Sequence, residues 1–319
     1  MTFEIISWNV LSEAMTKCLG DKSYKEIPAY DRYELMRKTL RILLSEHPTA
    51  IVCLQEFGET ERKACKSIFD ELNYTSILGC PSNYTSNESD KKFWSETRDE
   101  MSPGMYIPPS VELLGHGIQN LTENLPIQRA KIDWIPFKDR KGNPTGETIY
   151  SEFKRRISLI NWAIIGVNGK KIAIVNTHHP CVFYMQEFQA LVVEAQKKIA
   201  SDLLKESDFC IFTGDWNQRP QDDIWQDTMQ DRRSDLLPDE FEGVENLKVL
   251  TYCHPPEGFI SNWNGGFNGV LTHIAVYSST LRTYQTGEIK LLSEPMTESG
   301  PSEKYCSDHV PMVYEITLK

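Results

Sequence analysis

The stretch Phe212-Thr213-Gly214-Asp215-Trp216-Asn217 joins the end of an apolar run to a group of polar side chains. The run, residues 208–212, has the length of a buried strand. The arrangement recurs in three other segments: Ser7-Trp8-Asn9-Val10, Cys53-Leu54-Gln55-Glu56 and Ser307-Asp308-His309-Val310-Pro311. Because loops at strand ends can converge on one edge of a sheet, we expect these polar residues to form one site.

Apolar runs of strand length alternate with segments of helical periodicity along most of the chain. The helices that we expect cover residues 31–46, 59–72 and 183–205, and Pro220 is expected to open a short acidic helix. Strands are expected at 3–8, 50–54, 157–165, 171–176, 208–212, 271–277, 286–292 and 312–318, with Asn168-Gly169 as a hairpin turn. This alternation, without repeats or a linker, predicts one α/β domain over residues 1–319.

Residues 81–150 differ from the rest of the chain in composition. They are rich in Ser, Asn, Pro, Gly and charged residues. We interpret them as a variable insertion of loops and short elements. Two placements stay open: a cover over the active site or an ordinary surface excursion.

Composition places the chain among globular proteins outside the membrane. Hydrophobic residues make up 40% and charged residues 25% of the sequence. No apolar run approaches the ~20 residues of a membrane span. Eight scattered cysteines without CxxC spacing favour reduced thiols. With no basic leader at the start, we expect a cytoplasmic or nuclear protein that is not secreted.

The charge balance limits the partners that we expect. The formal net charge is −11, which disfavours duplex DNA, because binding to duplex DNA depends on many phosphate contacts. A small acidic substrate or a short single strand remains compatible with this charge, if a few cations and a metal hold it. A cluster of carboxylates for that metal would itself add negative charge.

Several of the polar residues suit metal-assisted hydrolysis. Glu56 directly follows a buried strand, where a carboxylate is costly unless it faces a cleft or binds a cation. Asp215 and Asn217 are two residues apart, so an extended backbone would point both to the same side. Together with Asn9 and Asp308 they offer oxygen ligands that suit Mg²⁺ or Mn²⁺ rather than zinc.

The histidines and Asp215 could then act on a phosphate. His178 and His309 could stabilise a phosphoryl group that is losing its leaving oxygen, while Asp215 orients or deprotonates water. Taken singly, each segment has an ordinary explanation: Asn9 as a turn or cap residue, Gly-Asp-Trp-Asn as a loop, and His178-His179-Pro180 as a hydrogen-bonded loop. The presence of all these segments in one chain favours a shared hydrolytic site.

In their order along the chain, Asn9-Val10-Leu11, Leu54-Gln55-Glu56, Asn176-Thr177-His178, Gly214-Asp215-Trp216-Asn217 and Ser307-Asp308-His309 resemble the endonuclease/exonuclease/phosphatase superfamily. The resemblance covers nearly the whole chain and is weakest between 81 and 150. It implies a four-layer α/β sandwich, two packed mixed β-sheets flanked by helices, that hydrolyses phosphate esters with Mg²⁺.

The resemblance also implies a role for each motif residue. Glu56 would be the principal metal ligand, with Asn9 and Asp308 nearby. The attacking water and the phosphate would be positioned by Asp215 and Asn217. The remaining two motif residues, His178 and His309, would bind phosphate oxygens and stabilise the transition state.

A finer likeness points to the branch of deadenylases, nocturnin and the angel proteins. It rests on Tyr30-Asp31-Arg32-Tyr33, on Pro220 after the Gly-Asp-x-Asn motif, and on the segment 267–274, which is similar to the branch's Phe-x-Gly-x-Leu-Asp-Tyr-Ile. The likeness implies a 3′ exonuclease or deadenylase-like enzyme acting on single-stranded RNA or an adenine nucleotide. Phe267 would stack on adenine, or else be a packing ring. Arg155, Arg156 and Arg219 are candidate phosphate ligands, with solvated surface charge as the alternative.

One residue departs from the family pattern. Thr272 stands where the family has an aspartate that partners the final histidine, so His309 should be less basic and less firmly oriented. A nucleotide-binding pseudoenzyme is therefore one alternative function. An inositol polyphosphate 5-phosphatase-like phosphomonoesterase is the other; Arg219 fits it, but its Trp-Cys-Asp-Arg segment is absent.

Overall fold

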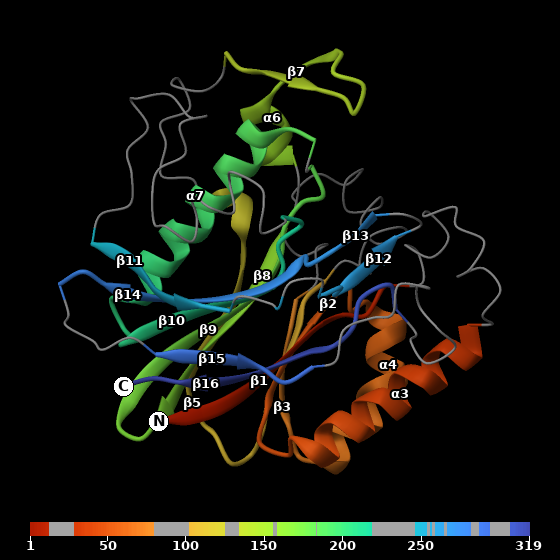
Figure 1. Cartoon of the computed structure of the whole chain (residues 1–319), viewed down its shortest axis with the longest axis vertical. Helices are drawn as coiled ribbons and strands as arrows, with labels where there is room; N and C mark the ends of the chain where they lie inside the picture. The colour runs from red at the N-terminus through yellow and green to blue at the C-terminus, as the bar shows by residue number, and fades with distance from the viewer. Residues whose placement is uncertain are drawn as a thin grey trace.

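Two β-sheets pack face to face, with helices on both outer surfaces (Figure 1). The computed structural model describes residues 1–12, 29–79, 102–124, 134–155, 158–182, 184–218, 246–253, 256, 259–264, 267–281, 287–293 and 307–319. Helices α3 and α4 lie against one sheet, and α7 lies against the other. The four-layer α/β sandwich that the motifs imply is therefore present.

The first sheet has six strands in the order β15-β16-β1-β2-β4-β3. β1 runs parallel to β2 and antiparallel to β16, so the sheet is mixed. Its strands are β1 (Thr2–Asn9), β2 (Ile51–Gln55), β3 (Thr75–Leu78), β4 (Gly104–Ile107), β15 (Glu288–Leu291) and β16 (Met312–Thr317). The parallel β1–β2 pair carries two of the motif segments to the same edge.

The second sheet also has six strands, in the order β11-β14-β10-β9-β8-β5. β9 and β10 are parallel, and the remaining pairs are antiparallel. Its strands are β5 (Glu112–Asn120), β8 (Leu159–Val167), β9 (Lys170–His178), β10 (Phe209–Asp215), β11 (Leu247–Tyr252) and β14 (Thr272–Ser279). Two short hairpins, β6 (Pro136–Lys138) with β7 (Pro144–Thr148) and β12 (Asn262–Asn264) with β13 (Phe267–Gly269), lie outside the sheets.

Alternate side chains of each central strand belong to different layers, as strand geometry requires. In β1, Ile5 packs between the sheets, whereas Ile6 packs under the helices. In β10, Ile211 packs between the sheets, whereas Phe212 packs under α7. Every inner strand is thus buried on both faces, which explains the nearly continuous apolar runs in the sequence.

The helices are α3 (Ala29–Glu46), α4 (Glu59–Glu71), α6 (Ile149–Arg155) and α7 (Gln186–Leu203), with the 3-10 helix η3 (Leu121–Glu123). A buried ion pair joins α3 to α4, with Arg32 Nη2 2.9 Å from Glu61 Oε1. Arg32 also donates to the carbonyls of Val10 and Leu11. The arginine therefore ties both helices to the segment that follows Asn9.

The expectation of loops and short elements over residues 81–150 is wrong for β4 and β5. Both are strands of the main sheets, and β4 lies inside the first sheet, between β2 and β3. Their glycines obscured this in the sequence. A Cβ on Gly104 would come within 2.7 Å of the Phe57 ring, and one on Gly117 within 2.6 Å of Trp162. Glycine is present here because an aromatic ring lies against the strand backbone.

The other expected elements within the described residues are present, with small shifts at their ends. The helix predicted after Pro220 lies outside the described residues. Among the described cysteines, Cys53, Cys65, Cys210 and Cys253 are buried, and Cys181 is exposed. None of the described helices has both the length and the apolar composition needed to cross a membrane.

Replacing Glu61 with alanine should lower the free energy of unfolding by about 3–5 kcal/mol, because it leaves the guanidinium of Arg32 buried without its carboxylate. Arg41 and Glu71 offer a matched control: they form the same kind of pair between the same helices, and both side chains are more than half exposed. Glu71→Ala should change stability little. Urea denaturation of both variants tests this, and equal losses would contradict it.

Candidate active site

The candidate site lies at one end of the layer between the two sheets, where inward-facing side chains change from aliphatic to polar. Along β10 the inward series runs from Ile211 through Thr213 to Asp215, and along β9 from Ile174 through Asn176 to His178. Asp215 and His178 are direct neighbours in the parallel ladder. Strand periodicity alone thus delivers polar side chains from two neighbouring strands of the second sheet to one edge.

Asn9 joins the carboxylates of the two sheets. Its Nδ2 donates to Glu56 Oε1 at 2.9 Å and to Asp215 Oδ2 at 3.0 Å. Its Oδ1 accepts from the backbone N of Leu11, so the amide presents its donor to the site and its acceptor to the chain. Glu56 Oε2 in turn accepts from the backbone N of Ser12 at 3.3 Å.

Two imidazoles, one from each sheet, face the carboxylate of Asp215. Nε2 of His178 lies 3.7 Å from Asp215 Oδ2 and 3.9 Å from Glu56 Oε1. Nε2 of His309 lies 3.4 Å from Asp215 Oδ2 and 4.0 Å from Asp308 Oδ1. The structure therefore brings together Asn9, Glu56, His178, Asp215, Asp308 and His309, as the sequence predicts.

The turn that carries Asp308 and His309 is fastened to β1. Ser307 Oγ donates to the carbonyl of Asn9 at 2.6 Å, and Trp8 Nε1 donates to the carbonyl of His309 at 3.0 Å. Asn262, the first residue of β12, forms a bridge with His309. Trp8 and Ser307 lie inside the sequence motifs, where no role is expected of them, and Asn262 lies outside every motif, so no sequence signal points to it.

Strained backbone surrounds the carboxylates. The φ values of Leu11, Glu56 and Asn217 are 55°, 51° and 50°. These lie in the left-handed region, which residues other than glycine rarely adopt. Gly214 has φ 143°, and a Cβ there would lie 1.8 Å from the Thr177 carbonyl oxygen. The glycine is required because β10 approaches β9 closely just before Asp215.

Asn217 is not in the extended geometry expected from the sequence, because its positive φ turns the chain back. Its backbone N donates to Asp215 Oδ1 at 2.9 Å, and its Nδ2 donates to the carbonyl of His179 at 2.7 Å. A local hydrogen bond of this kind competes with extended backbone. Asn217 therefore orients Asp215.

Burial and neighbouring charges perturb the carboxylates. Burial raises the pKa of Asp308 to about 6, and the negative charges of Glu56 and Asp215 add to this effect while His309 opposes it. Burial also acts to raise the pKa of Asp215, but His309 and His178, together with hydrogen bonds from Asn217 and Asn9, lower that pKa overall. The site thus concentrates negative charge where water is largely excluded.

This donor set fits a hard divalent cation. No three of the described His, Cys, Asp and Glu side chains converge closely enough to hold a metal by themselves. Mg²⁺ needs fewer protein ligands, because it usually keeps several waters and binds one or two carboxylates. A cation would also offset the repulsion from Glu56 and Asp215, which adds to the effect of burial on the pKa of Asp308.

Thr272 lies beside Asp215 in the β10–β14 ladder. Its Oγ1 is buried without a hydrogen bond among the described residues, and so is Nδ1 of His309. The expected loss of an acidic partner for His309 is consistent with this arrangement.

The four candidate substrate ligands lie mostly beyond the described residues. Arg156 and Arg219 are outside them, and only the backbone of Arg155, at the end of α6, is described. Phe267 is described by its backbone as the first residue of β13. It pairs with Asn264 in the hairpin whose first residue, Asn262, contacts His309.

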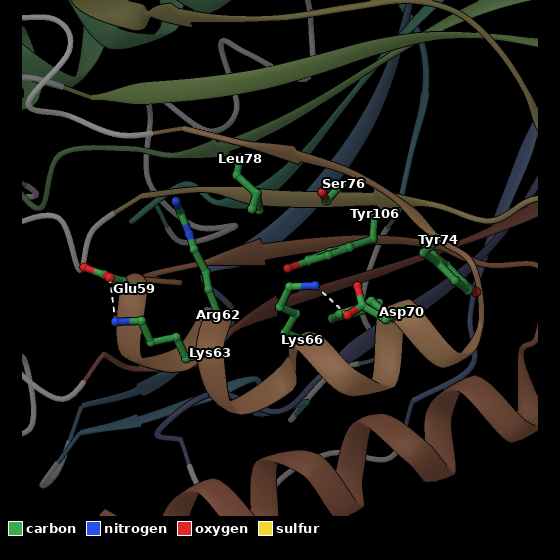
Figure 2. A pocket seen from close by; sticks show the side chains of 10 residues that line it. Glu59, Arg62, Lys63, Lys66, Asp70, Tyr74, Ser76, Leu78 and Tyr106 are labelled. Carbon is green, nitrogen blue, oxygen red and sulfur yellow. Dashed lines mark hydrogen bonds and ion pairs between the residues drawn. The ribbon is translucent and has the colours of Figure 1, made fainter.

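A separate hollow of about 170 Å³ lies on the helix side of the first sheet, between α4 and β3 (Figure 2). Lys63 pairs with Glu59, and Lys66 pairs with Asp70, one helical turn away in each case. Tyr106 in its wall packs in the cluster beneath the helices. The hollow is therefore on the outer side of that sheet, away from the layer that holds the site.

No family model matches the sequence, and no curated protein does. Solved structures do match. ANGEL2, described as a 2′,3′-cyclic phosphatase in complex with adenosine-2′,3′-vanadate, has a TM-score of 0.62 at 13% identity, over 100% of this chain and 96% of that chain. The human Nocturnin catalytic domain with bound sulfate has a TM-score of 0.59 at 15% identity, over 100% and 95%.

A third matching structure is described only as an endonuclease/exonuclease/phosphatase. The endonuclease/exonuclease/phosphatase from Bacteroides vulgatus has a TM-score of 0.59 at 15% identity and covers 100% of both chains. At such identities the likeness concerns the fold. The chain therefore adopts the endonuclease/exonuclease/phosphatase fold, which confirms the resemblance drawn from its five sequence motifs.

Proposed function

We propose that this protein is a metal-dependent phosphoesterase that hydrolyses phosphodiesters of RNA or of adenine-containing nucleotides, and that it is most similar in action to 3′ exonucleases and deadenylases. The observation that carries the proposal is the convergence of Glu56, Asp215 and Asp308 with His178 and His309, which come from both sheets. Buried carboxylates next to imidazoles are costly in a structural core and useful for phosphoryl transfer.

Each of these side chains has a task in the proposed reaction. Asp215 accepts a proton from the attacking water, whose oxygen forms the new bond to phosphorus while the bond to the leaving oxygen breaks. His178 and His309 donate hydrogen bonds to the phosphate oxygens, where negative charge grows. Asn217 holds Asp215 in place through its backbone N–H.

A divalent metal, Mg²⁺ or Mn²⁺, would be held by Glu56 and Asp308, with Asn9 nearby. When bound, it polarises a phosphate oxygen and offsets the charge of the transition state. Asn9 would then position Glu56 and Asp215 relative to each other through its two hydrogen bonds.

The adenine preference is supported by a structural neighbour and by the β12–β13 hairpin. ANGEL2 was solved with adenosine-2′,3′-vanadate. In this chain the hairpin carrying Phe267 begins at Asn262, which bridges to His309. An aromatic ring on this hairpin would lie near the scissile phosphate, where an adenine base could stack on it. Candidate ligands of the phosphate are Arg155, Arg156 and Arg219.

A substrate panel tests the class of reaction. It contains a 5′-labelled RNA ending in a short A-tail, adenosine-2′,3′-cyclic phosphate and an inositol polyphosphate, each with Mg²⁺ and with EDTA. Shortening of the RNA confined to its tail supports the exonuclease. Turnover of the cyclic phosphate alone supports a small-nucleotide enzyme. Hydrolysis of the inositol phosphate alone, or silence of the whole panel, would contradict the proposal.

Glu56→Ala should lower kcat by about 10²–10³-fold, since metal assistance supplies several kcal/mol of transition-state stabilisation. EDTA should abolish activity, and added Mg²⁺ should restore it in the wild type. Glu59→Ala is the matched control, because Glu59 is exposed and pairs with Lys63 outside the site. The measurement is kcat of both variants, after circular dichroism has shown that each is folded. A fully active Glu56→Ala would contradict the role of this carboxylate.

Phe267→Leu should raise KM for adenine substrates by roughly 5- to 150-fold, which corresponds to the ~1–3 kcal/mol of one base stacked on an aromatic ring. Phe267→Tyr keeps the ring and should keep KM. Steady-state kinetics on the A-tailed RNA or the cyclic nucleotide measure both. An unchanged KM in Phe267→Leu would identify the ring as a packing residue.

Thr272→Val should leave kcat and the unfolding midpoint almost unchanged, because the buried hydroxyl that it removes has no hydrogen bond among the described residues. Thr272→Asn, of different shape and polarity, serves as the disruptive comparison. A tenfold fall in kcat for Thr272→Val would show that the hydroxyl takes part in the reaction.

A further inference from the structure

Asn176 joins the two sheets directly beneath the site. Its side chain is fully buried on β9 of the second sheet. Nδ2 donates to the carbonyl of Leu54 at 2.9 Å and to the carbonyl of Gly104 at 3.0 Å. Oδ1 accepts from Gln55 Nε2 at 2.7 Å. All three partners belong to β2 and β4 of the first sheet.

Asn176 and two of its three partners are chain neighbours of the site residues. Asn176 precedes His178 by two residues, so both side chains face the layer between the sheets. Gln55 and Leu54 directly precede Glu56. The hydrogen bonds therefore lie about 6–7 Å along the strands from the point where His178 faces Glu56.

Apolar packing would not by itself fix how the sheets are aligned. The neighbouring inward positions, such as Ile174, Cys53 and Met105, contribute dispersion and the hydrophobic effect, neither of which is directional. Hydrogen bonds are directional, and a buried amide that loses its partners is costly. Asn176 therefore favours one relative position of β9 and β2.

We propose that Asn176 is a positioning residue: by hydrogen bonding to Gln55, Leu54 and Gly104 it sets the distance between His178 of one sheet and Glu56 of the other. Its effect on catalysis rests on the proposed function, whereas its effect on the geometry of the site does not. Gln55 assists it, since the same Nε2 also donates to Ser7 Oγ at 3.2 Å.

Asn161 provides a closely matched control. It is also a fully buried asparagine on the second sheet, and it is the direct partner of Asn176 in the β8–β9 ladder. Its Nδ2 also crosses to the first sheet, where it donates to the carbonyl of Ile77 at 2.7 Å. However, Ile77 lies in β3, the edge strand, which carries none of the site residues.

The experiment compares Asn176→Leu with Asn161→Leu, which are nearly isosteric and each remove a cross-sheet amide. Both should lower the unfolding midpoint. Asn176→Leu alone should weaken Mn²⁺ binding, measured by electron paramagnetic resonance, and lower kcat by ~10–100-fold, the range for residues that orient metal ligands. It alone should shift the imidazole NMR signals of His178 and His309.

A second variant covers the case in which Asn176→Leu does not fold. Gln55→Met removes one of the three bonds and leaves both donors of Asn176 in place, so it should weaken Mn²⁺ binding less and in the same direction. Unchanged Mn²⁺ affinity and imidazole signals in the folded variants, or equal changes in Asn161→Leu, would overturn the proposal.

The two proposals fail in different ways. A wild-type protein that hydrolyses none of the tested esters contradicts the proposed function only. In that case the Mn²⁺ affinity and the histidine signals still decide whether Asn176 positions the site. If wild-type protein binds no Mn²⁺, the histidine signals alone decide.

Discussion

The hydrogen bonds of Asn176 are the constraint on which the geometry of the site depends. Each sheet is internally aligned by its own ladder, but much of the contact between the two sheets is made by apolar side chains that impose no direction. The candidate site residues come from both sheets, so the proposed chemistry requires an alignment that apolar packing alone does not provide. A buried amide bonded to Gln55 and to two carbonyls provides it, one inward position below His178.

Next to the hydrogen bonds of Asn176, the negative charge of the buried carboxylates is partly compensated by nearby hydrogen-bond donors. Asn9 donates to carboxylates of both sheets, which lowers the cost of burying Glu56 and Asp215 together. Burial, together with the neighbouring charges of Glu56 and Asp215, raises the pKa of Asp308, and His309 offsets this only in part. Left-handed backbone at Glu56 adds strain at the same place. Such a combination is stable only because the four layers around it are closely packed.

At Thr272 the chain differs from the sequence pattern that its motifs resemble. Thr272 supplies no charge to His309, and Nδ1 of that histidine is buried without a hydrogen bond among the described residues. The imidazole must therefore be oriented by its backbone, through the contacts that Ser307 and Trp8 make with the turn. A histidine held in this way can still donate a hydrogen bond from Nε2, which is the atom that faces Asp215.

Local sequence patterns predict the α/β class, most strand and helix positions, and the six residues that meet at the site, because apolar periodicity and polar strand ends are properties of short segments. The remaining features depend on contacts between distant segments. β4 and β5 were hidden because their glycines accommodate rings from Phe57 and Trp162, residues distant in sequence. The left-handed turn at Asn217 and the role of Asn176 likewise depend on partners in other strands, and no local pattern encodes which strands will meet.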